Sequence, residues 1–160
     1  METLLLSDHC PDDIQRAGDI LRRGGLVAIP TETVYGLAAN ALDGEAVKKI
    51  YQAKGRPSDN PLIVHISRFS QLAPLVREVP ESAQKLAAAF WPGPLTIILP
   101  KSDVIPQQTS GGLDTVAVRC PSHPTARAVI DAAGVPLAAP SANLSGKPSP
   151  TTFLLSLIHI

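Results

Sequence analysis

Apolar residues along this chain follow two spacings, one typical of helices and one typical of strands. Between Pro11 and Gly24 they recur every three to four residues, which places them on one face of an amphipathic helix. Proline suits a first helical position, the two aspartates that follow suit the positive end of a helix, and glycine can end it. The pattern therefore predicts a helix near the start of the chain.

The two patterns alternate as far as residue 139. Further amphipathic stretches predict helices over residues 44–54, 81–90 and 123–133. Short, continuous apolar runs predict buried strands over residues 26–29, 62–66, 95–99, 115–119 and 137–139. The stretch between 99 and 115 is rich in Gln, Ser and Gly, and we expect a polar loop there. Because no repeat or low-complexity linker divides the pattern, the expected fold is one α/β domain with a mixed sheet.

Composition narrows the class of protein. The chain has 160 residues, of which 44% are hydrophobic, so it is long and apolar enough to bury one core. Its formal net charge is zero, which argues against a protein that holds nucleic acid by charge alone, although a local basic patch would still fit.

The cysteines and the N-terminus bear on the compartment. Cys10 and Cys120 stand in no metal-binding spacing, and we expect two reduced thiols. The first residues show neither a basic region nor an apolar run long enough for a signal peptide or a membrane span. We therefore expect a cytoplasmic protein without a membrane partner.

Polar side chains follow several of the predicted strands, where ligands bind in open α/β sheets. The first group is Thr31, Glu32 and Thr33, two hydroxyls and a carboxylate that come directly after a strand and Pro30. On composition alone, a helix cap explains them as well, since Thr and Glu near a helix start satisfy free N–H groups.

The second group lies at the end of the helix predicted over residues 44–54. Lys54 and Arg56 flank Gly55, and a stiff loop that contains Asn60 follows. Two cations at the negative end of a helix are one explanation. A rigid loop that carries Lys, Arg and Asn would also hold phosphate, although no Walker A motif is present.

Three further candidates each have a structural explanation beside the functional one. His65 lies within an apolar strand, where a hydrogen-bonded core histidine is the simpler interpretation. Ser141 and Asn143 are two residues apart in an extended loop and can point the same way, but they also favour turns. Arg119 ends an apolar strand, and one surface ion pair would account for it.

No segment decides the function alone, but five blocks occur together. In chain order they read PTETVYGLAANA, AKGRPSDNPLIVHI, WPGPLTIIL, TVAVRCPSHP and APSANLSGKPSPT. With this order and spacing the chain resembles the YrdC family, which makes threonylcarbamoyl-adenylate, over residues 12–152. The K-x-R and S-x-N pairs of that family stand here as Lys54 with Arg56 and Ser141 with Asn143.

The resemblance implies a fold and a reaction. It implies a twisted mixed sheet with flanking helices around a large, positively lined cavity, in a YrdC-like domain over residues 1–152. It implies a nucleotidyltransferase that converts L-threonine, bicarbonate and ATP to threonylcarbamoyl-AMP and pyrophosphate. Mg²⁺ would accompany the phosphates without metal ligands of the protein's own, and a tRNA threonylcarbamoyl transferase would take the product for modification of tRNA.

The resemblance also assigns roles to individual residues. Lys54 and Arg56 are the expected catalytic groups, because they would offset charge on the transferring phosphoryl centre. Arg119 would pair with the threonine carboxylate, and Thr33 is our candidate for a contact to the threonine hydroxyl. The expected ATP-binding residues are Lys54, Arg56, Asn60, Thr115, Ser141, Asn143 and Ser149. The expected threonine-binding residues are Thr33, His65, Arg119 and Ala139.

Two other functions are compatible with the resemblance. One is a carbamoyl-adenylate-forming relative, as in hydrogenase-maturation proteins, although the zinc-finger and acylphosphatase-like parts that accompany that domain are not visible here. The other is a non-catalytic module that binds double-stranded RNA. Lys48 and Lys49 with Lys54 and Arg56 would contribute to a basic patch, but zero net charge and few aromatic residues weigh against RNA binding as the sole function.

The last residues depart from the family pattern. Residues 153–160 are apolar and uncharged, where the family would continue with a polar helix, more sheet and further ligand groups. We interpret this tail as a truncated or altered end, such as a cloning scar. The alternative is a genuine short form whose tail packs as a strand.

Overall fold

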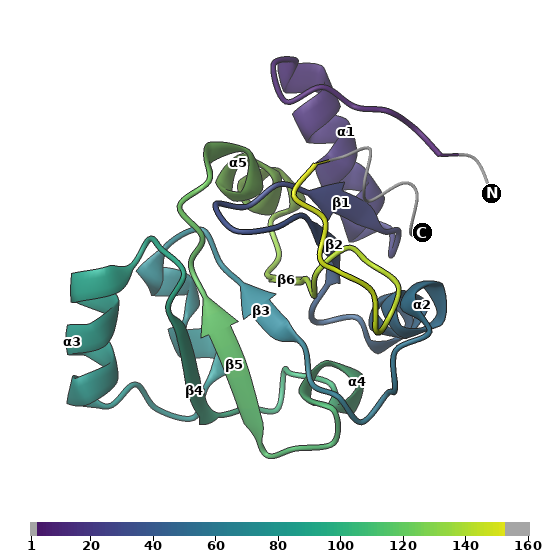
Figure 1. The fold of residues 1–160 in the computed structure, drawn as a ribbon. Helices are drawn as coiled ribbons and strands as arrows, with labels where there is room; N and C mark the ends of the chain where they lie inside the picture. Colours follow the sequence, from purple (N-terminus) through teal and green to yellow (C-terminus); the bar gives the residue numbers. More distant parts are fainter. Residues whose placement is uncertain (1–2, 153–160) are drawn as a thin grey trace.

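A computed structural model describes residues 3–152 of the chain, and the predicted tail at 153–160 lies outside the described residues. Figure 1 shows the helices grouped around one twisted sheet. The helices are α1 (Pro11–Arg22), α2 (Gly44–Lys54), α3 (Glu81–Phe90), α4 (Gln107–Ser110) and α5 (Pro124–Ala133), with two short 3-10 helices, η1 (Phe69–Gln71) and η2 (Ala73–Leu75). The strands are β1 (Val27–Ile29), β2 (Gly36–Asn40), β3 (Ile63–His65), β4 (Thr96–Pro100), β5 (Thr115–Arg119) and β6 (Leu137–Ala138).

The described strands form one mixed sheet in the order β1-β2-β6-β3-β5-β4. Only β3 and β5 run parallel among the pairs of this sheet, and the other neighbours are antiparallel. Residues that face each other in register project from the same side of a sheet, so His65, Arg119 and Thr96 share one side. We call this side the front face.

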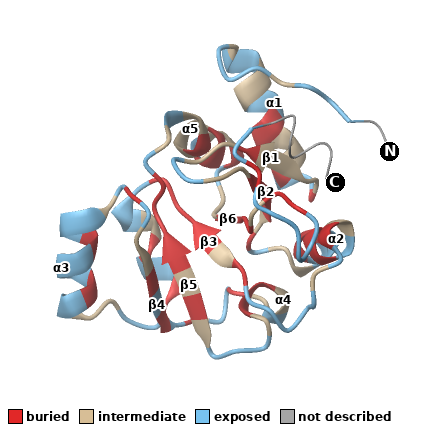
Figure 2. Cartoon of the chain, in the orientation of Figure 1, coloured by how far each residue is buried: buried red, intermediate tan, exposed pale blue. Residues whose placement is uncertain are grey.

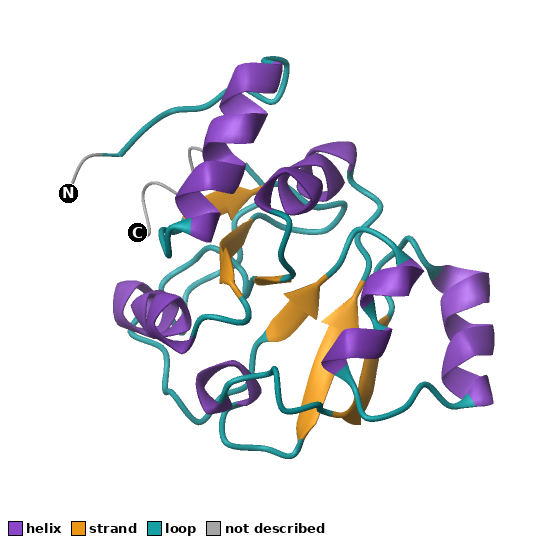
Figure 3. Cartoon of the chain, turned by 180° about the vertical axis from the view of Figure 1, so that it is seen from behind, coloured by secondary structure: helices purple, strands orange, loops and turns teal. Residues whose placement is uncertain are grey.

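The opposite side of the sheet carries the larger core. Val64, Val116 and Val118 point to this back face and are at most 2% exposed. They pack with the apolar faces of α2 and α3 in one continuous cluster. Figure 3, which looks from behind, shows α3 beside the sheet and short helical turns across its strands. Burial of this face leaves the front face available for other contacts.

Helices α1 and α5 cover only part of the front face. Their apolar residues form a second cluster with Ala38, Leu137 and Ala139 from the β2–β6 side of the sheet. Over β3, β5 and β4 the front positions are mostly half-buried or exposed, and Ile98 is 64% exposed. Figure 2 shows the same contrast, with buried residues concentrated where helices meet the sheet. An open half of the front face therefore remains beside α5.

The predicted α/β class and mixed sheet with flanking helices are confirmed. The helices at 44–54 and 81–90 and the strand at 115–119 have the predicted bounds. Strand β2, helix α4 and the two short 3-10 helices η1 and η2 were not predicted. Strand β2 was missed because its small residues, Gly-Leu-Ala-Ala-Asn, show no clear alternation, and α4 lies where a loop was expected.

Candidate functional site

The front face brings together three of the residues predicted to bind ligands. Arg119 ends β5, Thr115 begins the same strand four residues earlier, and His65 pairs with Arg119 on the neighbouring strand. Because side chains alternate along a strand, residues 115, 117 and 119 point to the same side. The predicted nucleotide residue Thr115 and the predicted threonine residues His65 and Arg119 thus share one surface.

Arg119 is held from three directions. Its Nε donates to the carbonyl oxygen of Gly93 at 3.3 Å, one terminal nitrogen donates to Thr33 Oγ1 at 3.3 Å, and the other forms an ion pair with Glu32. The residue is 8% exposed, so the single surface ion pair considered for it does not describe its setting. Burial lowers the pKa of Arg119 from its usual value, but a guanidinium stays protonated in proteins.

The segment that follows β1 presents Glu32 and Thr33 to this arginine. No helix begins in residues 30–36, so the helix-cap explanation for these residues is wrong. Thr33 Oγ1 also lies 3.0 Å from Thr31 Oγ1, and Thr31 donates its hydrogen to the carbonyl oxygen of Val34. Thr33 must therefore donate to Thr31, which leaves Thr33 Oγ1 as an acceptor toward Arg119 or a ligand hydroxyl.

His65 is 3% exposed, and its Nδ1 lies 3.1 Å from the carbonyl oxygen of Ile63. Burial lowers the pKa of His65 to about 4, despite hydrogen bonds to the backbone of Ile63 and Leu137. The ring is therefore neutral near pH 7. This environment matches the hydrogen-bonded core histidine, and the ring can act on a ligand only through its edge on the front face.

Lys54 ties two of the predicted segments together. It is the last residue of α2, and Gly55 ends that helix in the left-handed conformation with φ 61°. The Lys54 side chain is buried, and its ammonium donates to the carbonyl oxygens of Ser141 and Asn143, while Ser145 N donates to the Lys54 carbonyl at 2.8 Å. The K-x-R and S-x-N pairs are thus joined by this lysine.

The pKa of the Lys54 ammonium is unusually low for a lysine. Burial, together with the positive charge of the neighbouring Arg56, lowers its pKa to about 8. An ammonium has three N–H donors, and the two carbonyl bonds leave one donor for a ligand. The group can therefore hold the loop and still offer a hydrogen to a phosphate oxygen.

Asn143 has one polar atom without a partner. Its Nδ2 donates to the carbonyl oxygens of Leu144 and Lys147, both at 2.8 Å, which closes the turn after the S-x-N pair. Its Oδ1 is buried and accepts no hydrogen bond from the described part of the chain. An unpaired buried acceptor is costly, so this oxygen favours a ligand that brings an N–H or O–H donor.

The side chain of Arg56 lies along the loop that follows it, residues 57–61. Its side chain donates to the carbonyl oxygen of Pro61 at 3.1 Å and, at 3.4 Å, to that of Asn60. The Asn60 side chain is exposed, and Ser149 is exposed as well. Arg56 and Asn60 therefore lie on the loop that directly follows Lys54; we call the Lys54 ammonium with the Ser141 and Asn143 carbonyls that it binds the Lys54 clamp.

Helix α4, which the sequence analysis missed, supports this loop. The Tyr51 hydroxyl lies 2.8 Å from the carbonyl oxygen of Gln108 and 3.1 Å from that of Asn60. Thr109 donates from its hydroxyl to the carbonyl of Ala41 and accepts from Leu62 N through its own carbonyl. Two glycines after Ser110 were the signal for a helix end.

The segment 31–36 connects the Arg119 side to the Lys54 side. Thr33 contacts Arg119, while two residues on, Tyr35 accepts from Ala142 N at 2.7 Å and donates to the carbonyl of Pro150 at 3.0 Å. Ala139, predicted to contact threonine, is 7% exposed and lies at the end of β6 on the front face. Hydrogen bonds through segment 31–36 therefore link Arg119 to the loop that Lys54 holds.

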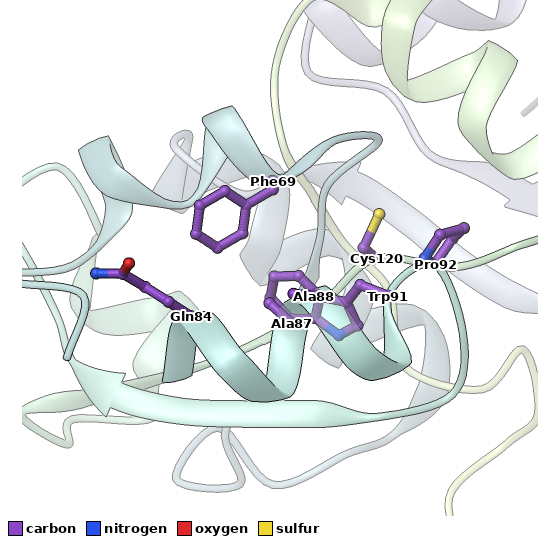
Figure 4. Close-up of a pocket in the computed structure, with 7 residues that line it drawn as sticks. All are labelled: Phe69, Gln84, Ala87, Ala88, Trp91, Pro92 and Cys120. Carbon is purple, nitrogen blue, oxygen red and sulfur yellow. The ribbon is translucent and has the colours of Figure 1, made fainter. Parts of the chain in front are cut away.

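The described part of the chain also contains two hollows whose linings include neighbours of these residues, Cys120 beside Arg119 in one and Tyr35 of segment 31–36 in the other. One has a volume of about 470 Å³ and lies between α3 and η1, as Figure 4 shows. The other, of about 1120 Å³, lies under the N-terminal segment beside α1 and β1. No predicted ligand-binding residue lines either of them, so the candidate site is an open face with loops around it. The first hollow is lined by Phe69, Gln84, Ala87, Ala88, Trp91, Pro92 and Cys120.

The remaining expectations concern metals, thiols and membranes. Within residues 3–152, no three His, Cys, Asp or Glu side chains are grouped so that they could hold a metal ion. Cys10 and Cys120 are free thiols, and burial raises the pKa of Cys120. No helix in the same range is long and apolar enough to cross a bilayer.

Comparisons with known proteins agree with the sequence blocks. The model of a family described as telomere recombination, which groups the Sua5, YciO and YrdC proteins, matches residues 19–155. A threonylcarbamoyl-AMP synthase of Pyrococcus abyssi is 62% identical over 139 residues, which are 87% of this chain and 41% of that protein. One of Bacillus subtilis is 60% identical over 147 residues, 91% of this chain and 42% of that protein.

A solved structure gives the same result in three dimensions. The P. abyssi Sua5 protein complexed with L-threonine superimposes with a TM-score of 0.92 at 57% identity, over 94% of this chain and 44% of that one. The present chain thus spans about two fifths of the length of these relatives.

Proposed function

The chain belongs to the Sua5, YciO and YrdC family, and from this membership we propose that it joins L-threonine, bicarbonate and ATP into threonylcarbamoyl-AMP and pyrophosphate. One observation supports the proposal above the others. Lys54 and Arg119 are linked by hydrogen bonds through segment 31–36, so a candidate phosphate-binding group and a candidate carboxylate-binding group belong to one connected part of the fold.

The proposed reaction needs positioning more than a protein nucleophile. The threonine amine attacks the carbon of carbon dioxide with loss of a proton, or that of bicarbonate with loss of water, and forms a carbamate. A carbamate oxygen then attacks the α-phosphorus of ATP, and the bond to the pyrophosphate oxygen breaks. Two anions must approach each other, so the protein has to hold both and offset the charge on the transferring group.

The nucleotide would lie across the Lys54 clamp. The third N–H of Lys54 and the guanidinium of Arg56 would bind phosphate oxygens. The unpaired Oδ1 of Asn143 would accept from a nucleotide donor, such as an amine or a hydroxyl. Asn60, Thr115, Ser141 and Ser149 would complete the contacts, and Mg²⁺ would enter with the phosphates as part of the substrate.

L-threonine would lie on the front face. Its carboxylate would pair with the guanidinium of Arg119. Its hydroxyl would donate to Thr33 Oγ1, whose own hydrogen is already given to Thr31. Ala139 and the edge of the neutral His65 ring would form the small apolar wall beside the methyl group.

Pyrophosphate release is the direct test. We expect release that requires both L-threonine and bicarbonate, and that falls at least about tenfold in Arg119→Ala and Lys54→Ala. Lys85→Ala is a matched control, because Lys85 is an exposed cation on α3 whose ammonium pairs only with Glu81. Release that needs a carbamoyl donor in place of threonine and bicarbonate would indicate a carbamoyl-adenylate-forming enzyme, and salt-dependent RNA binding without turnover would indicate an RNA-binding module. The product would be offered to a tRNA threonylcarbamoyl transferase in a coupled assay.

A further inference from the structure

Glu32 touches the candidate threonine site without being one of its predicted contacts. One carboxylate oxygen forms the ion pair with Arg119. The other accepts from the backbone N–H groups of Ser122 at 2.9 Å and His123 at 3.3 Å. Both oxygens are therefore engaged, and by groups from two different parts of the fold.

The second set of contacts lies at the beginning of α5. His123 is the N-cap residue of this ten-residue helix, and the N-terminal end of a helix carries a partial positive charge. Glu32 is thus a carboxylate held between a guanidinium and a helix N-terminus. Its side chain is 22% exposed, and that of Arg119 is 10% exposed, so solvent screens this pair less than a surface pair.

The remaining donors of Arg119 are set by these contacts. A guanidinium carries five N–H groups, of which the contacts to Gly93, Thr33 and Glu32 use one on each nitrogen. Each terminal nitrogen therefore keeps one N–H for a ligand. Without Glu32, the guanidinium would keep its contacts to Gly93 and Thr33 but would lose its only charged partner among them.

We propose that Glu32 is a positioning residue, which orients Arg119 against the N-terminus of α5 so that its two remaining N–H groups receive the carboxylate of the amino-acid substrate. The inference rests on the proposed function, because it assigns the carboxylate to Arg119. The alternative is a competitive role for Glu32. In that role Glu32 would occupy the place of the substrate carboxylate on Arg119 and would leave it when threonine binds. The two backbone N–H bonds to the second oxygen oppose such a departure.

Glu32→Gln tests the proposal with little change in shape. The amide keeps one acceptor oxygen, but its NH₂ group replaces the other oxygen. This NH₂ group faces either the guanidinium or the two backbone N–H groups, and two hydrogen-bond donors then face each other without an acceptor. We expect L-threonine to bind about tenfold more weakly by calorimetry, because a misplaced binding group loses affinity steeply. The affinity for ATP should stay within about twofold, because Glu32 does not contact the Lys54 clamp.

The matched control is Glu45→Gln, an equal change of charge at an exposed carboxylate that pairs with Lys48 on α2. It should leave threonine affinity unchanged. Unchanged threonine affinity in Glu32→Gln would overturn the proposal, and tighter binding would overturn it in favour of competition.

A second measurement does not depend on threonine. We expect the Nε–H proton of Arg119, followed by NMR, to exchange with water at least about tenfold faster in Glu32→Gln than in the unchanged chain, because the guanidinium loses a buried partner. Equal exchange rates would contradict the positioning role. If the unchanged chain binds no threonine but the exchange rates differ as expected, the proposed function fails while the positioning of Arg119 stands.

Discussion

Two buried bases, Lys54 and His65, control how the candidate site responds to pH. Burial lowers the pKa of both, to about 8 for Lys54 and to about 4 for His65. Lys54 is therefore mostly charged near neutral pH but loses its proton within the range of an ordinary assay. His65 stays neutral throughout that range and gains a proton only in acid.

We expect nucleotide affinity to fall as the pH rises through about 8. Below that pH the Lys54 ammonium offers a third hydrogen and a charge to a phosphate, and above it the neutral amine needs both its hydrogens for the carbonyls of Ser141 and Asn143. Calorimetric titrations with ATP between pH 6 and 10 would measure this midpoint.

The variant Arg56→Ala tests whether Lys54 is the group whose titration sets this midpoint. Because the charge of Arg56 lowers the pKa of Lys54, its removal should move the midpoint upward, even though overall affinity decreases. A midpoint that stays in place would assign the pH dependence to another group.

The stability of the fold should decrease in acid through His65. Its pKa is about 4 in the folded chain and 6.5 ordinarily, so the unfolded chain takes up the proton first. The stabilisation is complete above pH 6.5 and is lost as the pH falls through 4, with an upper limit of about 3 kcal/mol.

Urea unfolding at pH 7.0 and 4.5 compares the unchanged chain with His65→Gln, whose amide takes up no proton in this range. The variant should be less stable at pH 7 but lose less stability in acid. His9→Gln is the control, since the His9 side chain is 95% exposed, and it should leave the pH dependence as it was. An identical pH dependence in all three chains would show that His65 is not the group that titrates.

At the scale of elements, the short helix α4 supports residues 55–61, the loop that we propose binds phosphate. Gly111 ends it with φ 60°, and a Cβ at this position would lie 2.9 Å from the backbone atoms Asp59 O and Pro61 N. The loop that carries Arg56 therefore packs directly on a position that only glycine fills without displacement.

We expect Gly111→Ala to lower both stability and nucleotide affinity. The left-handed conformation costs about 1 kcal/mol for alanine, and the clash with the loop backbone adds about 1–3 kcal/mol. Thermal unfolding and ATP titration measure the two effects. Gly134→Ala is a close control, because Gly134 has φ 68° but nothing within 4 Å of an added Cβ. Equal losses in the two variants would mean that the contact with residues 59–61 has no effect.

At the scale of the whole molecule, the back face of the sheet carries the larger core with α2 and α3, and the front face is covered only in part by α1 and α5. The front cover depends on close packing of α1 on α5, and a Cβ at Gly18 would lie 2.5 Å from the backbone carbon of Ala132. The position of this layer decides how much of the front face stays open.

Gly18→Ala should therefore destabilise the chain by about 2–4 kcal/mol, although alanine favours a helix by ~1 kcal/mol over glycine. Chemical unfolding measures the change. Gly44→Ala offers a comparison, since its Cβ would meet the flexible Gln108 side chain, also at 2.5 Å, which can move away at little cost. A smaller loss for Gly18→Ala than for Gly44→Ala would contradict the packing of α1 on α5.

Local sequence patterns predicted the elements that have strong local signals. Helix α2 begins at an Asp43 cap and ends at Gly55, and both residues act within one turn of the helix. Strand β2 lacks such signals, and helix α4 has only the glycines that follow it. Strand β2 forms because Gly36, Ala38 and their neighbours fit between β1 and β6, which no local pattern records.

By itself, the sequence determined the family through its five blocks, the alternating α/β order, and the residue types available for binding anions. Only the tertiary structure decided which of these residues meet. It joined Lys54 to Ser141 and Asn143 across almost ninety residues, and Glu32 to Arg119 across a similar separation. The physical reason is that hydrogen bonds and ion pairs depend on distance in space, which chain folding sets and spacing along the sequence does not.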